Sequence, residues 1–401
     1  MRYLAVIVMC CCVFLNFMIY SGYAGGSSGS GAAQALPAQA GEETAESGVP
    51  GLSGPGGARA FPFAENGNTD APRLRQIANT MQTTIDRVSL QESVLRPKHY
   101  RGIYLHNYSA RIPSILSEYV TKAKAHGLNA FVLDMQDSVY FNPGEIPASN
   151  IEICLSNEIW PIARIVVFPY GLKEYPVPQA FIDDRMELAA KAVELGFREI
   201  QFDYIRFEDT GRFAHLGHDA RYQVVEGFLG QARERFGPQG ITITADVFGR
   251  VTLNRNDIIG QRLEGLDKVV DVILPMTYPS HYGWDAFSMA NPYYTQHNAA
   301  VLGKERLSQA ELVLWVQGFE MKVAMSGLSL PVYIAHQIQA IEDAGVSGWI
   351  VWNAAQSYAP TWEALRLLAG SVPVPGLARA REVARARIEA AAPKEKGTAQ
   401  Q

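Results

Sequence analysis

The stretch Ile241-Thr-Ile-Thr-Ala-Asp246 gives the clearest indication of the fold. Apolar residues alternate with threonine along it and an acid stands at its carboxyl end, which is typical of a β-strand that buries one face. Short apolar runs recur eight times between Tyr100 and Gly370. The eight predicted strands cover residues 102–107, 130–137, 161–169, 199–207, 241–249, 270–279, 311–319 and 348–354.

Amphipathic helical patterns lie between these strands. The clearest are residues 114–126 and 181–195, each followed by a glycine, Gly127 or Gly196, that suits a helix C-terminus. Eight strand–helix alternations within one domain predict an α/β fold of the (β/α)8 TIM barrel type. An open doubly wound sheet typically carries a Gly-rich nucleotide turn after its first strand, and no such turn follows residues 102–107.

The ends of the chain differ from its centre. Arg2 precedes an uncharged apolar run from Tyr3 to Tyr20 and then small residues through Gly25, a pattern that predicts an export signal cleaved after Ala24 or a retained membrane anchor. The protein is therefore expected outside the cytoplasm, whether secreted, periplasmic or membrane-anchored. The predicted organisation is a signal peptide or anchor (1–24), a Gly/Ser/Ala/Pro-rich linker (25–60), a helical lead-in (61–97), the barrel (98–372) and a basic, Ala-rich tail (373–401).

Composition restricts the function classes. The 401 residues include 35 Lys plus Arg and 40 Asp plus Glu, so there is no basic excess to neutralise a phosphate backbone, and no nucleic-acid partner is expected. Three of the four cysteines lie in the N-terminal apolar run. The fourth, Cys154, is interpreted as a small buried side chain rather than a nucleophile.

Acidic residues gather where the barrel would place an active site, at the carboxyl ends of its strands. Alternation within each strand predicts that Asp134, Asp203 and Asp246 point into the barrel from the second, fourth and fifth strands. Arg164 has the same parity as Val166 and is a candidate counter-charge. Asp137 has the opposite parity to Asp134 and would reach the mouth only through its loop.

Several blocks of sequence resemble the bacterial glycoside hydrolase family DUF4015. They are Tyr100-Arg-Gly-Ile-Tyr104, Phe131-Val-Leu-Asp-Met-Gln-Asp137, Ala163-Arg-Ile-Val-Val-Phe168, Gln201-Phe-Asp-Tyr-Ile-Arg-Phe207 and Asp271-Val-Ile-Leu-Pro-Met-Thr-Tyr-Pro-Ser-His-Tyr282. The resemblance extends from about Lys98 to Leu368, and its most specific element is Pro-Met-Thr-Tyr-Pro-Ser. It implies a (β/α)8 barrel distantly related to amylase-like and other retaining glycosidases.

Glycoside hydrolysis needs one carboxylic acid that protonates the departing oxygen and one carboxylate that attacks or activates water. By analogy with amylase-like barrels we expect Asp203 to be the nucleophile and Asp246 the acid/base, with Asp134 as a third acid. Flat aromatic rings near strand ends suit sugar rings, Tyr282 and Trp284 among them, whereas Trp315 and Trp349 are interpreted as core. The predicted substrate-binding residues are Asp137, Arg164, Tyr104, His106, Arg206, Glu208, Tyr278, His281, Trp352 and Asn353.

Alternatives stay open at this point. Arg206 fits a structural ion pair as well as a substrate contact, and Asp137 and Glu208 fit turn caps. The histidines have no metal-ligand spacing, so His106 and His281 are interpreted as hydrogen-bonding groups at the rim, and no metal or cofactor is expected. The predicted function is a glycoside hydrolase with a carbohydrate substrate. A non-catalytic carbohydrate-binding barrel is the alternative, and a different hydrolase or lyase on the same scaffold is a third.

Overall fold

The computed structural model describes residues 71–137, 142–143 and 145–391 of the chain. The predicted signal segment and linker lie outside these residues. The chain divides into two units, Met1–Asn79 and Thr80–Gln401, and helix α2 (Ala71–Ser93) contains the boundary. Among the described helices, none is both long enough and apolar enough to cross a membrane.

A closed barrel of parallel strands forms the centre of the second unit. Its sheet has the order β10-β11-β1-β2-β5-β6-β7-β8-β9, and β9 and β10 are two segments of one stretch of chain interrupted at Val313. Treating them as one strand gives eight strands that close on themselves, which confirms the predicted (β/α)8 barrel. The strands are β1 (Tyr100–Leu105), β2 (Ala130–Asp134), β5 (Trp160–Val166), β6 (Glu199–Asp203), β7 (Thr242–Phe248), β8 (Val272–Met276), β9 (Glu311–Leu312), β10 (Leu314–Gln317) and β11 (Gly348–Trp352).

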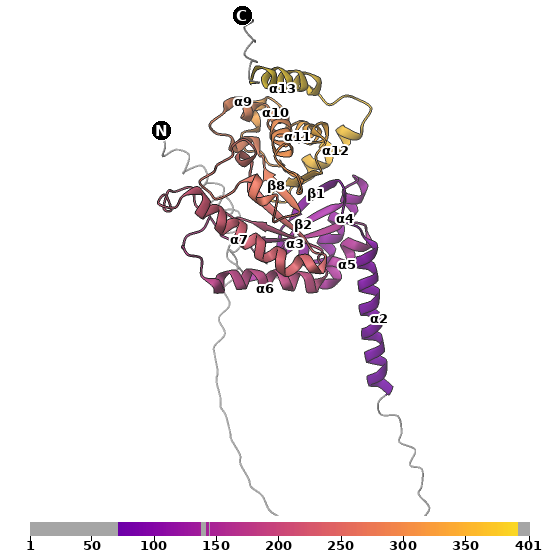
Figure 1. The fold of residues 1–401 in the computed structure, drawn as a ribbon. Coiled ribbons are helices and arrows are strands. Elements are labelled where there is room, and N and C mark those ends of the chain that lie inside the picture. Colours follow the sequence, from indigo (N-terminus) through magenta and orange to yellow (C-terminus); the bar gives the residue numbers. More distant parts are fainter. Residues whose placement is uncertain (1–70, 138–141, 144, 392–401) are drawn as a thin grey trace, which may run out of the picture. The chain divides into compact units, whose positions relative to one another are not determined.

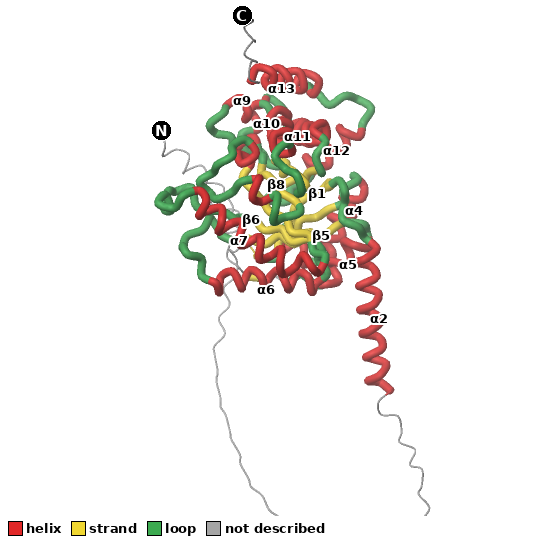
Figure 2. Tube along the Cα trace, viewed as in Figure 1, coloured by secondary structure: helices red, strands yellow, loops and turns green. Residues whose placement is uncertain are grey.

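Helices surround the strands, as Figures 1 and 2 show. Those predicted at 114–126 and 181–195 are α4 and α6 in the structure, and Gly127 and Gly196 both have the positive φ expected at a helix end. The helices of this unit are α3 (Asn107–Arg111), α4 (Pro113–Ala125), α5 (Ala148–Ser156), α6 (Gln179–Leu195), α7 (His218–Phe236), α8 (Leu263–Leu266), α9 (Ala286–Ala290), α10 (Pro292–Lys304), α11 (Leu330–Ala344), α12 (Ala359–Ala369) and α13 (Leu377–Ala391). Within the described residues, 3-10 turns add residues 237–239, 249–252, 279–281 and 323–326.

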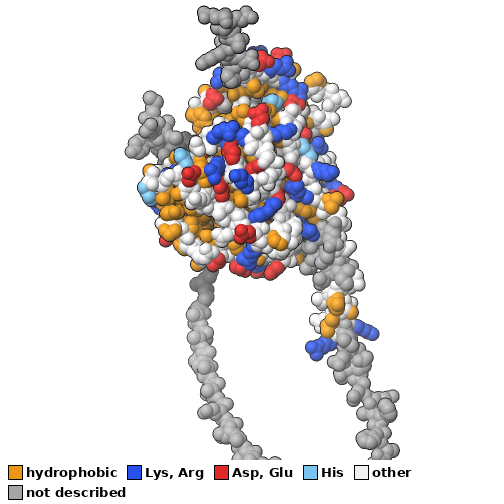
Figure 3. Space-filling view, in the orientation of Figure 1, with side chains coloured by type: hydrophobic (Ala, Val, Ile, Leu, Met, Phe, Trp, Pro, Cys, Tyr) orange, Lys and Arg blue, Asp and Glu red, His pale blue; other side chains and the backbone are white. Residues whose placement is uncertain are grey.

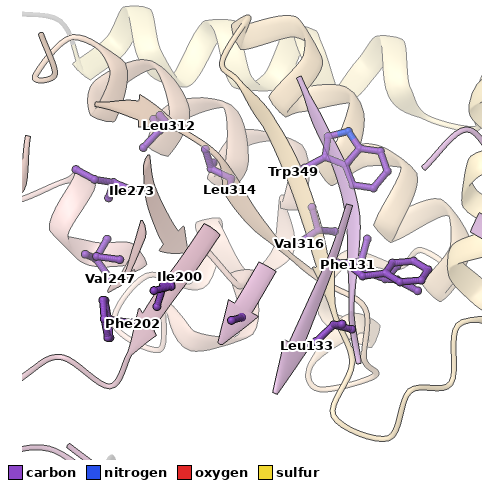
Figure 4. Close-up of a cluster of buried hydrophobic side chains, with 14 of the residues drawn as sticks. Phe131, Leu133, Ile200, Phe202, Val247, Ile273, Leu312, Leu314, Val316 and Trp349 are labelled. Carbon is purple, nitrogen blue, oxygen red and sulfur yellow. The ribbon is translucent and has the colours of Figure 1, made fainter. Parts of the chain in front are cut away.

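Two hydrophobic layers hold the barrel together, because the strands bury both faces. The larger layer lies between the sheet and the helices; Figure 4 labels side chains from several strands of this layer. The smaller one fills the barrel interior and includes Val132, Ile162, Leu274, Trp315 and Ile350. Alternation along each strand therefore assigns a side chain either to the helix layer or to the interior, where the acids of the strand ends also lie.

Gly348 allows the last strand to meet the first. Its φ is +124°, and a Cβ at this position would lie 2.1 Å from the carbonyl oxygen of Tyr100. No side chain can be accommodated there without moving the backbone of β1. The glycine is thus a requirement of closure, since Tyr100 pairs with it in the register of β1 and β11.

The lone cysteine of the barrel and the Arg-rich C-terminal helix both have structural roles. Cys154 is fully buried in α5, and burial raises the pKa of its thiol to about 12, as suits an inert side chain. In the Arg-rich helix α13, Arg381 pairs with Asp343 of α11 through two hydrogen bonds of 2.7 and 2.9 Å. Figure 3 shows Lys and Arg interspersed with Asp and Glu on the face in view, without a region of one sign.

Candidate active site

A buried arginine joins two of the three predicted acids. Strand register places Arg164 of β5 beside Asp134 of β2, and its Nη1 donates to Asp134 Oδ1. Its Nε donates to Asp203 Oδ2 over 3.0 Å and its Nη2 contacts the same oxygen. All three residues are at most 5% exposed. A charge buried to this extent needs such partners, so the three side chains form one ion-pair network.

Aromatic rings enclose this network. The guanidinium of Arg164 lies 5.1 Å from the ring centre of Trp352 and 5.6 Å from that of Tyr104. The Tyr104 hydroxyl donates to Asp134 Oδ2, and burial with the neighbouring Asp134 charge holds the Tyr104 pKa well above its usual value. These rings and hydrogen bonds fix the arginine in position, and both aromatic residues were predicted for this site.

Asp246 lies in the same interior but has different partners. Its Oδ1 accepts hydrogen bonds from Gln201 Nε2 and Trp315 Nε1, each at 2.6 Å. Its Oδ2 is buried and has no hydrogen-bond partner among the described residues. Burial, and then the charge of Asp203, raise the Asp246 pKa well above its ordinary value, while Arg164 opposes the rise. The environment therefore favours the protonated acid.

Tyr278, beyond the end of β8, completes this group. Burial and the nearby charges of Asp246 and Asp203 raise its pKa well above the usual value, which keeps the phenol neutral. A neutral phenol near two carboxyls can donate a hydrogen bond. The interior thus contains an ion-paired carboxylate, a carboxyl that favours its proton, and a hydroxyl donor.

Arg206 forms no ion pair with the residues that the structure describes, so the structural ion pair considered for it is not seen there. Its guanidinium lies 4.6 Å from the Phe248 ring centre, and its Nη1 donates to the carbonyl oxygen of Phe207 over 2.9 Å. Burial lowers its pKa, and the charge of Asp209 is the strongest opposing influence. It lies beside the acid cluster rather than within it.

Two other predicted residues are occupied by contacts inside the protein. Glu208 accepts from Thr210 Oγ1 at 2.7 Å and pairs with Arg212 at 3.6 Å, so it stabilises its own turn. Asn353 donates to the carbonyl oxygens of Gly318 and Ser357 and accepts from the Ser357 amide. Their contacts are those of residues that hold the loops.

The two predicted histidines make local contacts of their own. His106 caps α3, its Nδ1 accepting from the Tyr108 amide at 3.2 Å, which makes it an acceptor in this contact. His281 is exposed and its Nδ1 lies 3.0 Å from Ser280 Oγ. Asp137 belongs to β3 (Gln136–Asp137), which pairs with β4 (Asn142–Pro143), and its side chain lies outside the described residues.

Sequence reasoning missed Trp315 as a partner of an acid. It was expected to be core, and it is fully buried, but it belongs to the barrel interior and reaches Asp246. A second omission is Glu199 at the start of β6, which accepts hydrogen bonds of 2.8 Å from Tyr100, Trp160 and Thr244. Its signal was available, because Glu199 has the same parity as Gln201 and Asp203.

Comparison with known proteins supports the resemblance drawn from the motifs. Residues 175–358 match the family DUF4015, described as "Putative glycosyl hydrolase domain". The matched range contains Asp203 and Asp246, whereas Asp134 and Arg164 precede it. No curated protein matches the sequence.

Solved structures with a similar fold include a spore cortex-lytic enzyme, a mannanase and a chitinase. The spore cortex-lytic enzyme SleL of Bacillus megaterium QM B1551 has 14% identity and a TM-score of 0.47, with 68% of this chain and 74% of that chain covered. The endo-1,4-beta-mannanase of Rhizomucor miehei has 11% identity and a TM-score of 0.48, covering 65% and 88%. A Group II chitinase catalytic domain of Ostrinia furnacalis has 12% identity and a TM-score of 0.47, covering 69% and 98%.

Proposed function

We propose that this protein is a glycoside hydrolase that cleaves an extracytoplasmic polysaccharide or glycan, with Asp203 as nucleophile and Asp246 as acid/base. One observation carries the proposal: within one buried interior, Asp203 is ion-paired with Arg164, while Asp246 favours its proton and keeps one oxygen without a partner. A carboxylate held in an ion pair, in the same interior as a carboxyl whose burial favours its proton, meets the needs of glycosidic cleavage.

The first step would be protonation of the departing glycosidic oxygen. The unpartnered Oδ2 of Asp246 is the atom that could carry this proton, since Oδ1 already accepts from Gln201 and Trp315. As the bond to the departing oxygen breaks, the Asp203 carboxylate attacks the anomeric carbon and forms a glycosyl ester. Asp246, now ionised, would then take a proton from the water that hydrolyses this ester.

Arg164, together with Asp134, would position the nucleophile Asp203. Arg164 binds Asp203 through Oδ2, so we assign the attack on the sugar to the other oxygen, Oδ1, which accepts from the Tyr204 amide at 2.5 Å. Asp134 accepts a hydrogen bond from Nη1 of the same arginine, so Arg164 is held between the two acids. The Tyr278 hydroxyl would donate to a sugar oxygen near both acids.

The extracytoplasmic location is part of the proposal and rests on the N-terminal sequence. Arg2, the apolar run that follows it and the small residues through Gly25 are the features that support it. Mass spectrometry of the mature N-terminus tests this point, because a protein that starts at Gly25 was cleaved, whereas an intact apolar run in the membrane fraction identifies an anchor.

Activity is tested with a panel of glycans, comparing the parent with Asp203→Asn and Asp246→Asn. Both variants should remain folded and lose turnover on the glycan that the parent cleaves. Azide should restore activity to Asp203→Ala and yield a glycosyl azide, because it replaces the missing nucleophile. Unchanged turnover in either Asn variant would remove that residue from the proposed role.

A carbohydrate-binding barrel without catalysis is the second candidate. It is favoured by the observation that Arg164 holds both Asp134 and Asp203, which are two of the three acids. The same panel separates the two functions. Glycan binding without release of reducing ends from any member would support the binding protein.

A further inference from the structure

We propose that the mouth of the barrel binds an extended glycan chain rather than a single terminal sugar, with Trp284 as the stacking platform on one side. This inference rests on the proposed function and specifies its substrate as polymeric. Trp284 lies in the loop after β8 and is 63% exposed, although a tryptophan normally buries most of its surface.

The loop presents this ring from a fixed turn. The Asp285 amide donates to the Tyr282 carbonyl over 2.8 Å, closing a tight turn with Gly283 and Trp284 at its corners. The Asp285 carboxylate then caps α9, accepting from the Phe287 amide at 3.1 Å and from Ser288 Oγ at 2.6 Å. Both ends of the turn are thus held by hydrogen bonds.

A buried tyrosine supports the exposed ring from below. The rings of Trp284 and Tyr282 lie 5.1 Å apart at 42°, and Tyr282 is 3% exposed. A Cβ on Gly249 would come within 2.8 Å of the Tyr282 hydroxyl, so Tyr282 packs closely on the residue that follows β7. Trp284 is therefore connected by direct packing to the strand end that carries Asp246.

Other exposed aromatic rings follow strands on the far side of the mouth. Tyr108, after β1, is 47% exposed, and Tyr170, after β5, is 36% exposed. In the barrel order β1 and β5 flank β2, and β2 stands opposite β8 when β9 and β10 count as one strand. A chain that stacks on Trp284 and reaches the other rim must cross the acids between them.

The apolar faces of pyranose rings stack on flat aromatic side chains, and successive rings of a polymer can use separated platforms. The occupant we infer is therefore a glycan of several units lying across the mouth, cleaved within the chain. A single terminal sugar could not stack on the aromatic rings of both rims, because these rings follow strands on opposite sides of the barrel.

Calorimetry tests the platform without turnover. In an Asp203→Asn background, soluble glucan, mannan, glycol chitin and a polyuronate are titrated, each beside its disaccharide. For the polymer that binds, Trp284→Ala should weaken binding about tenfold, with a much smaller change for the disaccharide, and Trp284→Phe should restore most of the affinity. Val372→Ala, which truncates another exposed apolar side chain, is the control and should leave binding unchanged.

Hydrolysis gives the second measurement. With Asp203 intact, Trp284→Ala should lower kcat/KM about tenfold more for the polymer than for an aryl glycoside of the same sugar, mainly through KM. An equal loss on both substrates, or unchanged polymer affinity, would overturn the platform even if the hydrolase proposal stands. Polymer binding that depends on Trp284 in a parent without any hydrolytic activity would overturn the hydrolase and retain the platform.

Discussion

Two buried carboxyls in the same barrel, Glu199 and Asp246, differ in how many of their oxygens are satisfied. Glu199 lies at the amino end of β6, and its two oxygens accept three hydrogen bonds, from Tyr100, Trp160 and Thr244. Asp246 lies near the carboxyl end of β7, and one of its oxygens has no partner among the described residues. Burial raises the pKa of both acids.

The difference fits a structural role for Glu199 and, under the proposed function, a catalytic role for Asp246. The hydrogen bonds to Glu199 offset part of the cost of its burial and give each of its oxygens at least one partner. Asp246 pays a similar desolvation cost with one oxygen unused, and the charge of Asp203 adds to it. An unpartnered buried atom of this kind is costly for folding, so its presence at a strand end favours a functional explanation.

The largest expected effect is on turnover. Asp246→Asn should reduce kcat on the cleaved glycan by about 10²–10⁴-fold, because an amide cannot donate the proton that general acid catalysis supplies. Glu199→Gln is the matched control and should retain most of the activity, since the amide can accept from Tyr100 and Trp160 and donate to Thr244. Steady-state kinetics checks both, and equal losses would erase the distinction between the two acids.

Removal of the shared arginine should have the next largest effect, on stability. Arg164→Met leaves Asp134 and Asp203 buried without their counter-charge, at a cost of about 3–5 kcal/mol in the free energy of unfolding. Arg381→Met, which breaks an ion pair on the surface of α13, should cost below about 1 kcal/mol. Denaturant unfolding measures both, and similar values for the two variants would contradict the network.

A smaller loss of stability should follow when one hydrogen bond to Glu199 is removed. Thr244→Val removes the hydroxyl that donates to Glu199 Oε1 and should cost about 1–3 kcal/mol. Thr361→Val is the control, because the Thr361 hydroxyl is buried without a hydrogen-bond partner among the described residues. Thermal unfolding should show no loss in this variant, and a loss equal to that of Thr244→Val would mean that the bond to Glu199 contributes little.

The smallest effect is a slope in stability with pH. A carboxyl whose pKa is raised on folding binds a proton that the unfolded chain has released, so stability falls as pH rises from the ordinary Asp range to the raised value. The expected slope from Asp246 is up to about 1.4 kcal/mol per pH unit. Asp246→Asn should flatten the unfolding free energy in this range, and an unchanged slope would show that Asp246 ionises normally.

The strands and most inward-facing acids could be predicted from the sequence. The alternation of apolar residues and threonine in the stretch ending at Asp246 showed which of its side chains face the barrel interior. The same reasoning predicted that Gln201 and Asp203 face inward. Trp315 could not be assigned in this way, because its strand is apolar on both faces and its sequence does not show which face points inward. The partners of Glu199 come from strands far apart in sequence, so only the closed barrel brings them together.

Loop residues were the hardest to predict, because their contacts depend on how neighbouring loops fold. Glu208 and Asn353 follow strands and are predicted to contact substrate, and the structure adds contacts within the protein that the sequence did not indicate. Beyond the end of a strand, the alternation of residues no longer determines where a side chain points. Arg206 is an example, because its guanidinium packs on the Phe248 ring. The sequence therefore predicts which strand ends have inward-facing acids better than it predicts the contacts of the loop residues that follow them.

The most direct test is the protonation state of Asp246 itself. Carboxyl ¹³C NMR of protein labelled at aspartate, recorded across pH beside Asp246→Asn, identifies its resonance as the one that the variant lacks. This resonance should keep the shift of a neutral acid near neutral pH and titrate well above the ordinary Asp value. A resonance that titrates in the ordinary acidic range would rule out Asp246 as the proposed acid, because no proton would then be held for the departing oxygen.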